Sequence, residues 1–187
     1  QRERYIDIAL DKSYRLEELI NELFDVARFN SEKIILEKEE LNLNLMFAQM
    51  IDDFYPILKE MDKEITFYAN EEIILYADSD KLSRVFNNLI KNAIYYSKEK
   101  TSIKVTAREE GKKVIVEVTN QGKQIPKEKL ARIFENFYRL DSSRTSKTGG
   151  SGLGLAIAKE IVELHQGKIS AISEENETTF TVVLPKK

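Results

Sequence analysis

The stretch Gly149-Gly150-Ser151-Gly152-Leu153-Gly154-Leu155 decides how this chain folds, because its glycines run directly into an apolar helical pattern over residues 153–165. Glycine lets backbone amides approach phosphate oxygens, and a helix N-terminus adds free N–H donors and the positive end of a dipole. A flexible linker is the alternative, but apolar residues follow the glycines at once. The stretch therefore predicts a phosphate-binding turn at the start of a helix.

Two better-known phosphate motifs do not match this stretch. A P-loop requires lysine followed by serine or threonine after Gly154, where this chain has Leu155 and Ala156. The dinucleotide-binding fingerprint requires glycine at position 155, and it should follow a strand. A polar segment precedes the glycines here instead.

That polar segment covers residues 140–151 and contains almost no apolar side chain. Structureless segments of about a dozen residues are uncommon in compact domains and most often form lids or binding loops. Arg139, Arg144 and Lys147 lie on or beside the segment. Because guanidinium and ammonium groups bind phosphate, we expect these side chains to reach a triphosphate.

A second candidate site lies on an expected helix over residues 79–96. Asn88 and Asn92 are four residues apart, which places them on one face of the helix, with Arg84 one turn earlier. A pair of solvated polar residues is the alternative, although asparagine is a mediocre helix former. Amide oxygens are hard ligands that suit Mg²⁺, which usually keeps waters and shares phosphate oxygens. The opposite face is apolar and is expected to face the core, with Leu82, Val85, Phe86, Leu89, Ile90 and Ala93.

Composition excludes several other classes of protein. The chain has 187 residues with 29 basic and 32 acidic side chains, and this balance argues against nucleic acid as a ligand. It has no cysteine, which removes disulfides and thiolate sites. No apolar run approaches the roughly 20 residues that a membrane span needs, and no signal peptide opens the chain. We expect a soluble, intracellular type of domain.

Residues 2–29 form a long helical pattern without glycine or proline. Its seam positions alternate spacings of three and four, as in a helical bundle, and they are Ile6, Ala9, Ser13, Leu16, Ile20, Leu23 and Ala27. An amphipathic helix that packs on its own domain is the alternative. We expect residues 1–33 to be one arm of a helical hairpin plus a linker, with the other arm missing, and residues 34–187 to be a complete domain.

The second domain mixes strand and helix patterns. Asp78 is an expected N-cap, a strand pair is expected to turn at Asn70-Glu71, and a β-hairpin is expected around Glu110-Gly111. The expected strands are 34–41, 65–68, 73–76, 103–108, 114–119, 169–173 and 179–184, and the expected helices are 43–60, 79–96, 127–134 and 153–165. A sheet covered by helices on one face follows, which is a two-layer α/β sandwich.

The remaining motif is Asn120-Gln121-Gly122, directly after a strand, where backbone can pass close to a flat ligand. In order, the motifs resemble the catalytic domain of sensor histidine kinases, which share a nucleotide-binding fold with gyrase, Hsp90 and MutL. Residues 88–93 resemble the family's N box, 120–126 its first glycine box, 134–139 its F box and 150–155 its second glycine box. The N-terminal helix resembles the second helix of the family's dimerisation and phosphotransfer hairpin.

The resemblance implies a site for ATP and Mg²⁺. Asn92 is implied to hold Mg²⁺, and Asn88 and Arg139 are implied to act on the phosphates during transfer. The implied nucleotide contacts are Asn88, Asn92, Tyr96, Asn120, Gly122, Ile125, Arg139, Gly150, Gly152, Leu153, Gly154, Leu155 and Thr178.

The resemblance also implies an activity and partners. The γ-phosphoryl group of ATP would pass to a histidine on the missing hairpin helix and then to an aspartate on a response-regulator receiver domain. The full protein would form a homodimer through its hairpin, and this chain would be the cytoplasmic portion of a membrane-anchored sensor. Residues 14–19, 137–141 and 152–160 are similar to the vancomycin-resistance VanS type, which implies glycopeptide-resistance signalling.

The sequence departs from the family pattern at several positions. Asn120 replaces the aspartate that recognises the adenine amino group, Gln124 replaces the second glycine of that box, and Tyr95 replaces a basic residue. The last glycine box is reduced to residues 177–180, where only Thr178 remains as a nucleotide contact. His165 is the only histidine, and no acidic residue follows it, so we do not expect it to be the phosphoacceptor.

Two alternatives remain open at this point. An ATPase switch of the gyrase type would carry glutamate where Asn88 stands, as the base that activates water. A non-enzymatic dimerisation module would bind nucleotide only to fix its shape.

Overall fold

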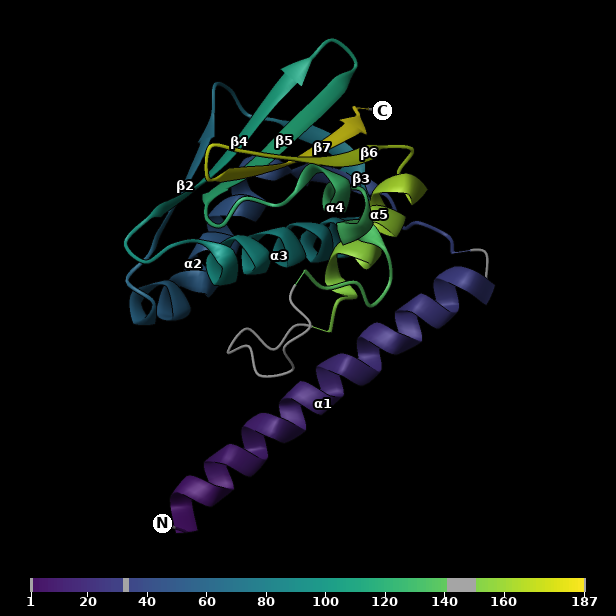
Figure 1. Cartoon of the computed structure of the whole chain (residues 1–187). Coiled ribbons are helices and arrows are strands. Elements are labelled where there is room, and N and C mark those ends of the chain that lie inside the picture. Colours follow the sequence, from purple (N-terminus) through teal and green to yellow (C-terminus); the bar gives the residue numbers. More distant parts are fainter. Residues whose placement is uncertain (1, 32–33, 141–150, 187) are drawn as a thin grey trace.

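The computed structural model describes residues 2–31, 34–140 and 151–186. A mixed five-stranded sheet forms one layer, in the order β2-β4-β5-β7-β6 (Figure 1). Strand β2 pairs in parallel with β4, and the other neighbours are antiparallel. The strands are β2 (Glu64–Ala69), β4 (Ser102–Glu110), β5 (Lys113–Gln121), β6 (Lys168–Glu174) and β7 (Glu177–Pro185).

Three helices cover one face of this sheet, α2 (Leu43–Glu60), α3 (Ser79–Tyr96) and α5 (Gly154–Leu164) (Figure 1). The core lies between the layers, where Phe47 of α2 stacks on Phe67 of β2 with ring centroids 4.8 Å apart and meets Phe86 of α3 at 4.9 Å. The apolar face expected for α3 is fully buried. The expected two-layer α/β sandwich is therefore confirmed.

The hairpin of β4 and β5 and the closing pair of β6 and β7 are also confirmed. Asp78 caps α3 as expected, because its Oδ1 accepts from the Lys81 backbone N–H at 3.1 Å. The helix expected over 127–134 is instead two short pieces, α4 (Lys127–Leu130) and the 3-10 turn η1 (Arg132–Phe134).

The expected pairing of the strands on either side of Asn70-Glu71 is wrong. Strand β3 (Ile74–Ala77) pairs with β1 (Glu39–Asn42) in a separate two-stranded sheet, while β2 joins the main sheet beside β4. The intervening segment is held by α2, since the Asn44 side chain accepts from the Ile73 N–H at 3.0 Å and donates to the Glu71 carbonyl at 3.3 Å. A hairpin turn is thereby replaced by contacts with a helix.

The strand expected over 34–41 is shorter than predicted. Strand β1 begins only at Glu39, because its partner β3 has four residues and no further strand residue to offer. The Glu37 backbone N–H donates to the Asp78 carboxylate at 3.1 Å instead of to a strand.

Helix α1 (Arg2–Ser31) confirms the long helical pattern and extends away from the two layers, contacting α5 (Figure 1). Several seam residues of α1 are exposed, with Ile6 at 59%, Leu16 at 58% and Leu23 at 55%. No helix within the described ranges is long and apolar enough to cross a membrane.

Candidate nucleotide-binding site

The first part of the candidate site lies where α3 meets the start of α5. The Asn88 side chain donates from Nδ2 to the Gly154 carbonyl oxygen at 2.9 Å. A Cβ at Gly154 would lie 3.3 Å from the Asn88 amide group, so a side chain at that position would crowd the contact. Asn88 and Gly154 are therefore fitted to each other across 66 residues of sequence.

The glycine-rich turn before α5 is fixed by the segment that the sequence assigned to an F box. Gly152 has φ +79°, a conformation that favours glycine, and a Cβ there would lie 2.9 Å from the Phe137 carbonyl carbon. The Phe137 N–H donates to the Gly152 carbonyl at 3.0 Å, and the Leu153 N–H donates to Ser151 Oγ at 3.0 Å. No side chain caps α5, which leaves first-turn N–H groups for other acceptors.

The F box segment is itself anchored on the sheet layer. The Phe134 ring meets the Phe180 ring edge to face at 6.4 Å, and the Arg132 guanidinium lies 4.5 Å above the Tyr138 ring. Partly exposed Arg139 follows directly, close in sequence to the expected loop. Gly149, Gly150, Arg144 and Lys147 were also predicted to contact phosphate, and all four lie outside the described residues.

The second part of the candidate site lies at the end of β5. Asn120 is only 4% exposed and stands opposite Thr178 in the register of β5 and β7. Ser173 Oγ lies 2.8 Å from Thr178 Oγ1 and accepts from the Ile125 N–H at 2.9 Å. Three predicted nucleotide contacts, Asn120, Ile125 and Thr178, are thus gathered around one buried serine.

Gly122 brings this strand end against the C-terminus of α3. A Cβ at Gly122 would lie 2.4 Å from the Tyr96 carbonyl oxygen, so only glycine allows this approach. The Lys98 N–H donates to the Gln121 carbonyl at 2.7 Å, and the Gly122 N–H donates to the Asn176 carbonyl at 2.7 Å. The glycine that the sequence suggested for a flat ligand is therefore required by backbone packing as well.

The two parts are joined along α3. Asn88, Asn92 and Tyr96 follow one another at intervals of four residues, about 6 Å apart along the helix axis. Both asparagines are partly exposed, and Tyr96 is 50% exposed. This row, hereafter the asparagine row, runs from the start of α5 to the strand end at Asn120 and Gly122.

Lys63 and Ser173 were missed by the sequence interpretation. The buried Lys63 ammonium group donates to the Ile94 and Ser97 carbonyls, which end α3, with the latter at 3.0 Å. Burial lowers the pKa of Lys63 against the opposing charge of Glu99. The only sequence signal was a polar residue at an alternating strand position for Ser173, and nothing local marked Lys63.

Comparisons with known proteins agree with this geometry. Residues 77–187 match the family described as histidine kinase-, DNA gyrase B- and HSP90-like ATPase. The sensor protein VanS of Enterococcus faecium is 51% identical over 185 residues, which cover 99% of this chain and 48% of VanS. The chain spans about half the length of the curated relatives it matches.

Two solved structures of the histidine kinase ThkA are also similar. The nucleotide-free catalytic domain of ThkA has a TM-score of 0.73 and 34% identity, covering 80% of this chain and 96% of that one. ThkA in complex with the response regulator protein TrrA has a TM-score of 0.79 and 31% identity, covering 98% of this chain and 51% of that one.

The sheet, the glycine turn and the asparagine row define a nucleotide-binding ATPase domain, and the chain belongs to the family of histidine kinase-, DNA gyrase B- and HSP90-like ATPases. Within that family its relatives are sensor histidine kinases, with VanS among them. The resemblance drawn from the ordered motifs is confirmed.

Proposed function

We propose that this protein is the catalytic part of a two-component sensor histidine kinase, with the second helix of the dimerisation hairpin and a linker in residues 1–33 and the catalytic domain in residues 34–187. The observation that carries the proposal is the asparagine row between the start of α5 and the strand end at Asn120. A nucleotide fits this row in one orientation. Its phosphates would lie at the α5 end, where N–H groups are available, and its base at the Asn120 end.

The donor set on α3 fits Mg²⁺ bound together with phosphate. Within the described residues there is no cluster of three or more His, Cys, Asp or Glu side chains that could hold a metal by itself. Amide oxygens are hard ligands, and Mg²⁺ usually completes its shell with water and phosphate oxygens. Asn92 would hold the ion, which when bound neutralises charge on the phosphates.

The remaining contacts follow from the same orientation. Backbone N–H groups over 150–155 would cradle the phosphates, with Asn88 and Tyr96 beside them, and Arg139 would couple the loop to the γ-phosphate. Ile125 and Leu153 would form apolar walls for adenine. Asn120 and Gly122 would frame its edge, with Thr178 behind Asn120.

The proposed reaction is transfer of the γ-phosphoryl group to a histidine on a hairpin helix outside this chain. The imidazole nitrogen attacks the γ-phosphorus, and ADP leaves. Enzymes of phosphoryl transfer act mainly by positioning and charge stabilisation, which suits a site built from asparagines and backbone amides. The phosphoryl group would then pass to an aspartate on a response regulator.

The geometry of Asn88 favours a kinase over an ATPase switch. A switch of the gyrase type needs a carboxylate that takes a proton from water. Asn88 carries no charge, and its amide donates to the Gly154 carbonyl. Water is therefore left without a base at this position.

The proposal extends to partners and location. The ThkA complex with TrrA supports a response-regulator receiver domain as a partner of this chain. The exposed seam of α1 supports a homodimer formed through the hairpin. The identity to VanS supports a role as the cytoplasmic portion of a membrane-anchored sensor in glycopeptide-resistance signalling.

Transfer to a separately supplied dimerisation hairpin tests the proposal. The chain is incubated with Mg-ATP labelled at the γ-phosphate and with an intact hairpin that bears the histidine. We expect acid-labile label on the hairpin and none when Asn92→Ala replaces the wild-type chain. Nucleotide binding without transfer would support the dimerisation module. Steady hydrolysis near about 1 s⁻¹ without an acceptor, within the usual enzyme range, would support the ATPase switch.

A further inference from the structure

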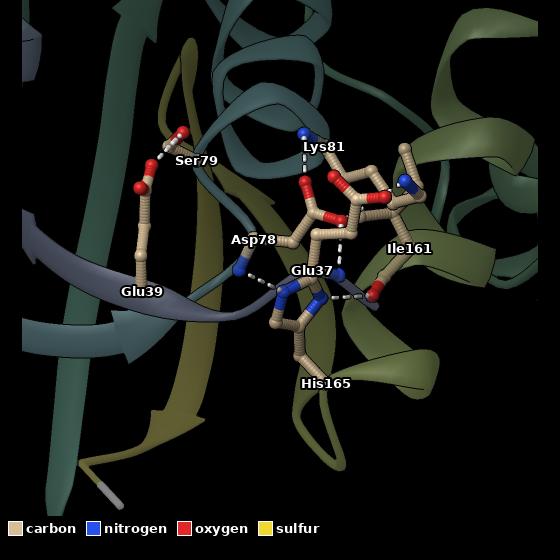
Figure 2. Close-up of polar contacts among 7 residues, drawn as sticks. All are labelled: Glu37, Glu39, Asp78, Ser79, Lys81, Ile161 and His165. Atoms are coloured by element: carbon tan, nitrogen blue, oxygen red, sulfur yellow. Dashed lines mark hydrogen bonds and ion pairs between the residues drawn. The ribbon is translucent and has the colours of Figure 1, made fainter. Parts of the chain in front are cut away.

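Two buried side chains, Asp78 and His165, join three separate parts of the fold (Figure 2). Asp78 is the N-cap of α3, and His165 is the C-cap of α5. The third part is the segment 34–38, which leads from α1 into the domain and is hereafter the linker. Each side chain is 3% exposed.

The Asp78 carboxylate holds both the start of α3 and the linker. Its Oδ1 accepts from the Lys81 backbone N–H at 3.1 Å, and its Oδ2 accepts from the Glu37 backbone N–H at 3.1 Å. The Lys81 ammonium group adds a contact to Oδ2 at 2.9 Å, which neutralises the buried charge. One carboxylate thereby fixes a helix end with one oxygen and the linker with the other.

His165 extends this junction to α5. Its Nδ1 lies 2.8 Å from the Ile161 carbonyl oxygen, and its Nε2 lies 3.1 Å from the Asp78 backbone nitrogen (Figure 2). A carbonyl can only accept and a backbone N–H can only donate. The ring is therefore neutral, with its hydrogen on Nδ1, and it connects the end of α5 directly to the start of α3.

The same two helices meet again at the candidate nucleotide site. Asn88, in the middle of α3, donates to Gly154, the first residue of α5. The helices are therefore tied at two places, once at the nucleotide site through Asn88 and once at the far end of α5 through His165. The linker is attached only at the second place.

We propose that Asp78 and His165 are positioning residues that couple order in the linker to nucleotide occupancy, a role that rests on the proposed function. A nucleotide that bridges the asparagine row and the start of α5 restrains the two helices relative to each other. Motion at their other junction is restrained with them, and the Glu37 N–H stays on Asp78. Because coupling between sites is reciprocal, a linker held on Asp78 also strengthens nucleotide binding.

Hydrogen exchange of the linker amides tests this coupling on the 187-residue chain. Exchange over residues 34–38 is measured by mass spectrometry with and without the non-hydrolysable analogue Mg-AMPPNP. We expect the analogue to slow exchange of the wild-type linker about fivefold or more, the lower end for coupled sites. Analogue affinity is measured by calorimetry on the same samples.

The variant Asp78→Asn isolates the linker contact. Asparagine remains a good N-cap, but it keeps only one acceptor oxygen and cannot serve both Lys81 and Glu37. We expect this variant to fold, to bind the analogue about fivefold more weakly and to lose the added protection of the linker. Ser79→Ala is the matched control, because it removes only the exposed contact from Ser79 Oγ to Glu39 at 2.7 Å, and it should behave as wild type.

Each outcome separates this inference from the proposed function. If the wild-type chain binds the analogue without slower exchange in the linker, the coupling is wrong while the nucleotide site stands. If Asp78→Asn keeps the same nucleotide-dependent protection as wild type, Asp78 does not carry the coupling. If the wild-type chain does not bind the analogue, the proposed function fails, and this inference fails with it.

Discussion

The Asn88 side chain donates to the Gly154 carbonyl across 2.9 Å, which ties the middle of α3 to the first residue of α5. The direction of this bond matters, because a carbonyl needs a donor opposite it. A carboxylate at position 88, the group that an ATPase switch requires, would face the same carbonyl with two acceptors. The bond therefore links the chemistry of the site to its stability.

Asn88→Asp tests that link. The aspartate cannot donate to Gly154, and an unsatisfied buried acceptor costs about 1–3 kcal/mol, so we expect the free energy of unfolding to fall by about that amount. Urea denaturation followed by circular dichroism measures it. Asn87→Asp is the control, because it makes the same charge change on a partly exposed neighbour in α3. Equal losses in the two variants would mean that the charge, and not the bond, is responsible.

Asn92→Ala should reduce Mg²⁺-dependent nucleotide affinity while leaving the fold intact. Asn92 is partly exposed on the asparagine row, next to the buried face of α3. We expect at least about tenfold weaker binding of Mg-ATP, equivalent to about 1.4 kcal/mol, and little change in binding without Mg²⁺. Calorimetry in both conditions measures the difference, with Asn87→Ala as control. Equal Mg-ATP binding in the wild type and Asn92→Ala would overturn the metal assignment.

The pH dependence of stability should report on His165. Burial lowers the pKa of His165, and nearby Lys38 and Lys81 act in the same direction, against the Ile161 hydrogen bond and the Asp78 charge. The unfolded imidazole, with a pKa near about 6.5, then binds a proton more readily than the folded one. Stability is therefore complete above about pH 6.5 and is lost as the pH falls below it, with a slope of at most about 1.4 kcal/mol per pH unit.

Urea denaturation between about pH 5 and 7 measures this slope. His165 is the only histidine in the chain, so ordinary carboxylates, which titrate near about pH 4, contribute little in that window. His165→Asn keeps a donor for Ile161 without a titrating ring and should remove the slope. A slope that survives in this variant would assign the pH dependence to another group.

His165 should also carry no phosphate. Both ring nitrogens are engaged, one with Ile161 and one with the Asp78 N–H, and the side chain is 3% exposed. Neither nitrogen is free to attack phosphorus. Incubation of the chain alone with labelled Mg-ATP should leave no acid-labile phosphate on it, as measured after alkaline gel electrophoresis. Label recovered on the peptide that contains His165 would contradict the structure.

Local patterns in the sequence predicted much of the fold. The bounds of α2 and α3 and the hairpin of β4 and β5 depend on periodicity and turn residues that lie within a few positions of one another. The partner of β2 could not be predicted in this way. Strand β4 lies more than thirty residues further along the chain, and the segment after β2 is held by Asn44, which precedes it.

The candidate site divides in the same manner. Asn88 and Asn92 could be predicted because four-residue spacing on a helix places them on one face. Ser173 could not, since its role depends on Ile125, which lies 48 residues away, as well as on Thr178. Lys63 reaches carbonyl groups more than thirty residues away. Buried polar residues take their meaning from partners that only the fold brings together.

Asn120 is the departure from the family pattern with the most direct consequence for specificity. It is 4% exposed, and in the described part of the chain its side chain makes no hydrogen bond, because the Thr178 hydroxyl is paired with Ser173. Its Nδ2 would lie 3.2 Å from a Cβ at Gly122. The amide is thus available to a ligand, and its oxygen is an acceptor for the adenine amino group.

Asn120→Asp should tighten ATP binding and sharpen its discrimination from GTP. A carboxylate accepts from the adenine amino group with a full charge, and charge-assisted bonds are roughly twice as strong as neutral ones. We expect a gain on the order of 1 kcal/mol, against the cost of burying the carboxylate in the free protein. Calorimetry with ATP and GTP measures both effects. Asn176→Asp, the same change at an exposed turn position beside Gly122, should leave the ATP to GTP ratio unchanged. If Asn120→Asp weakens ATP binding or leaves that ratio unaltered, adenine is recognised elsewhere and the placement of the base is wrong.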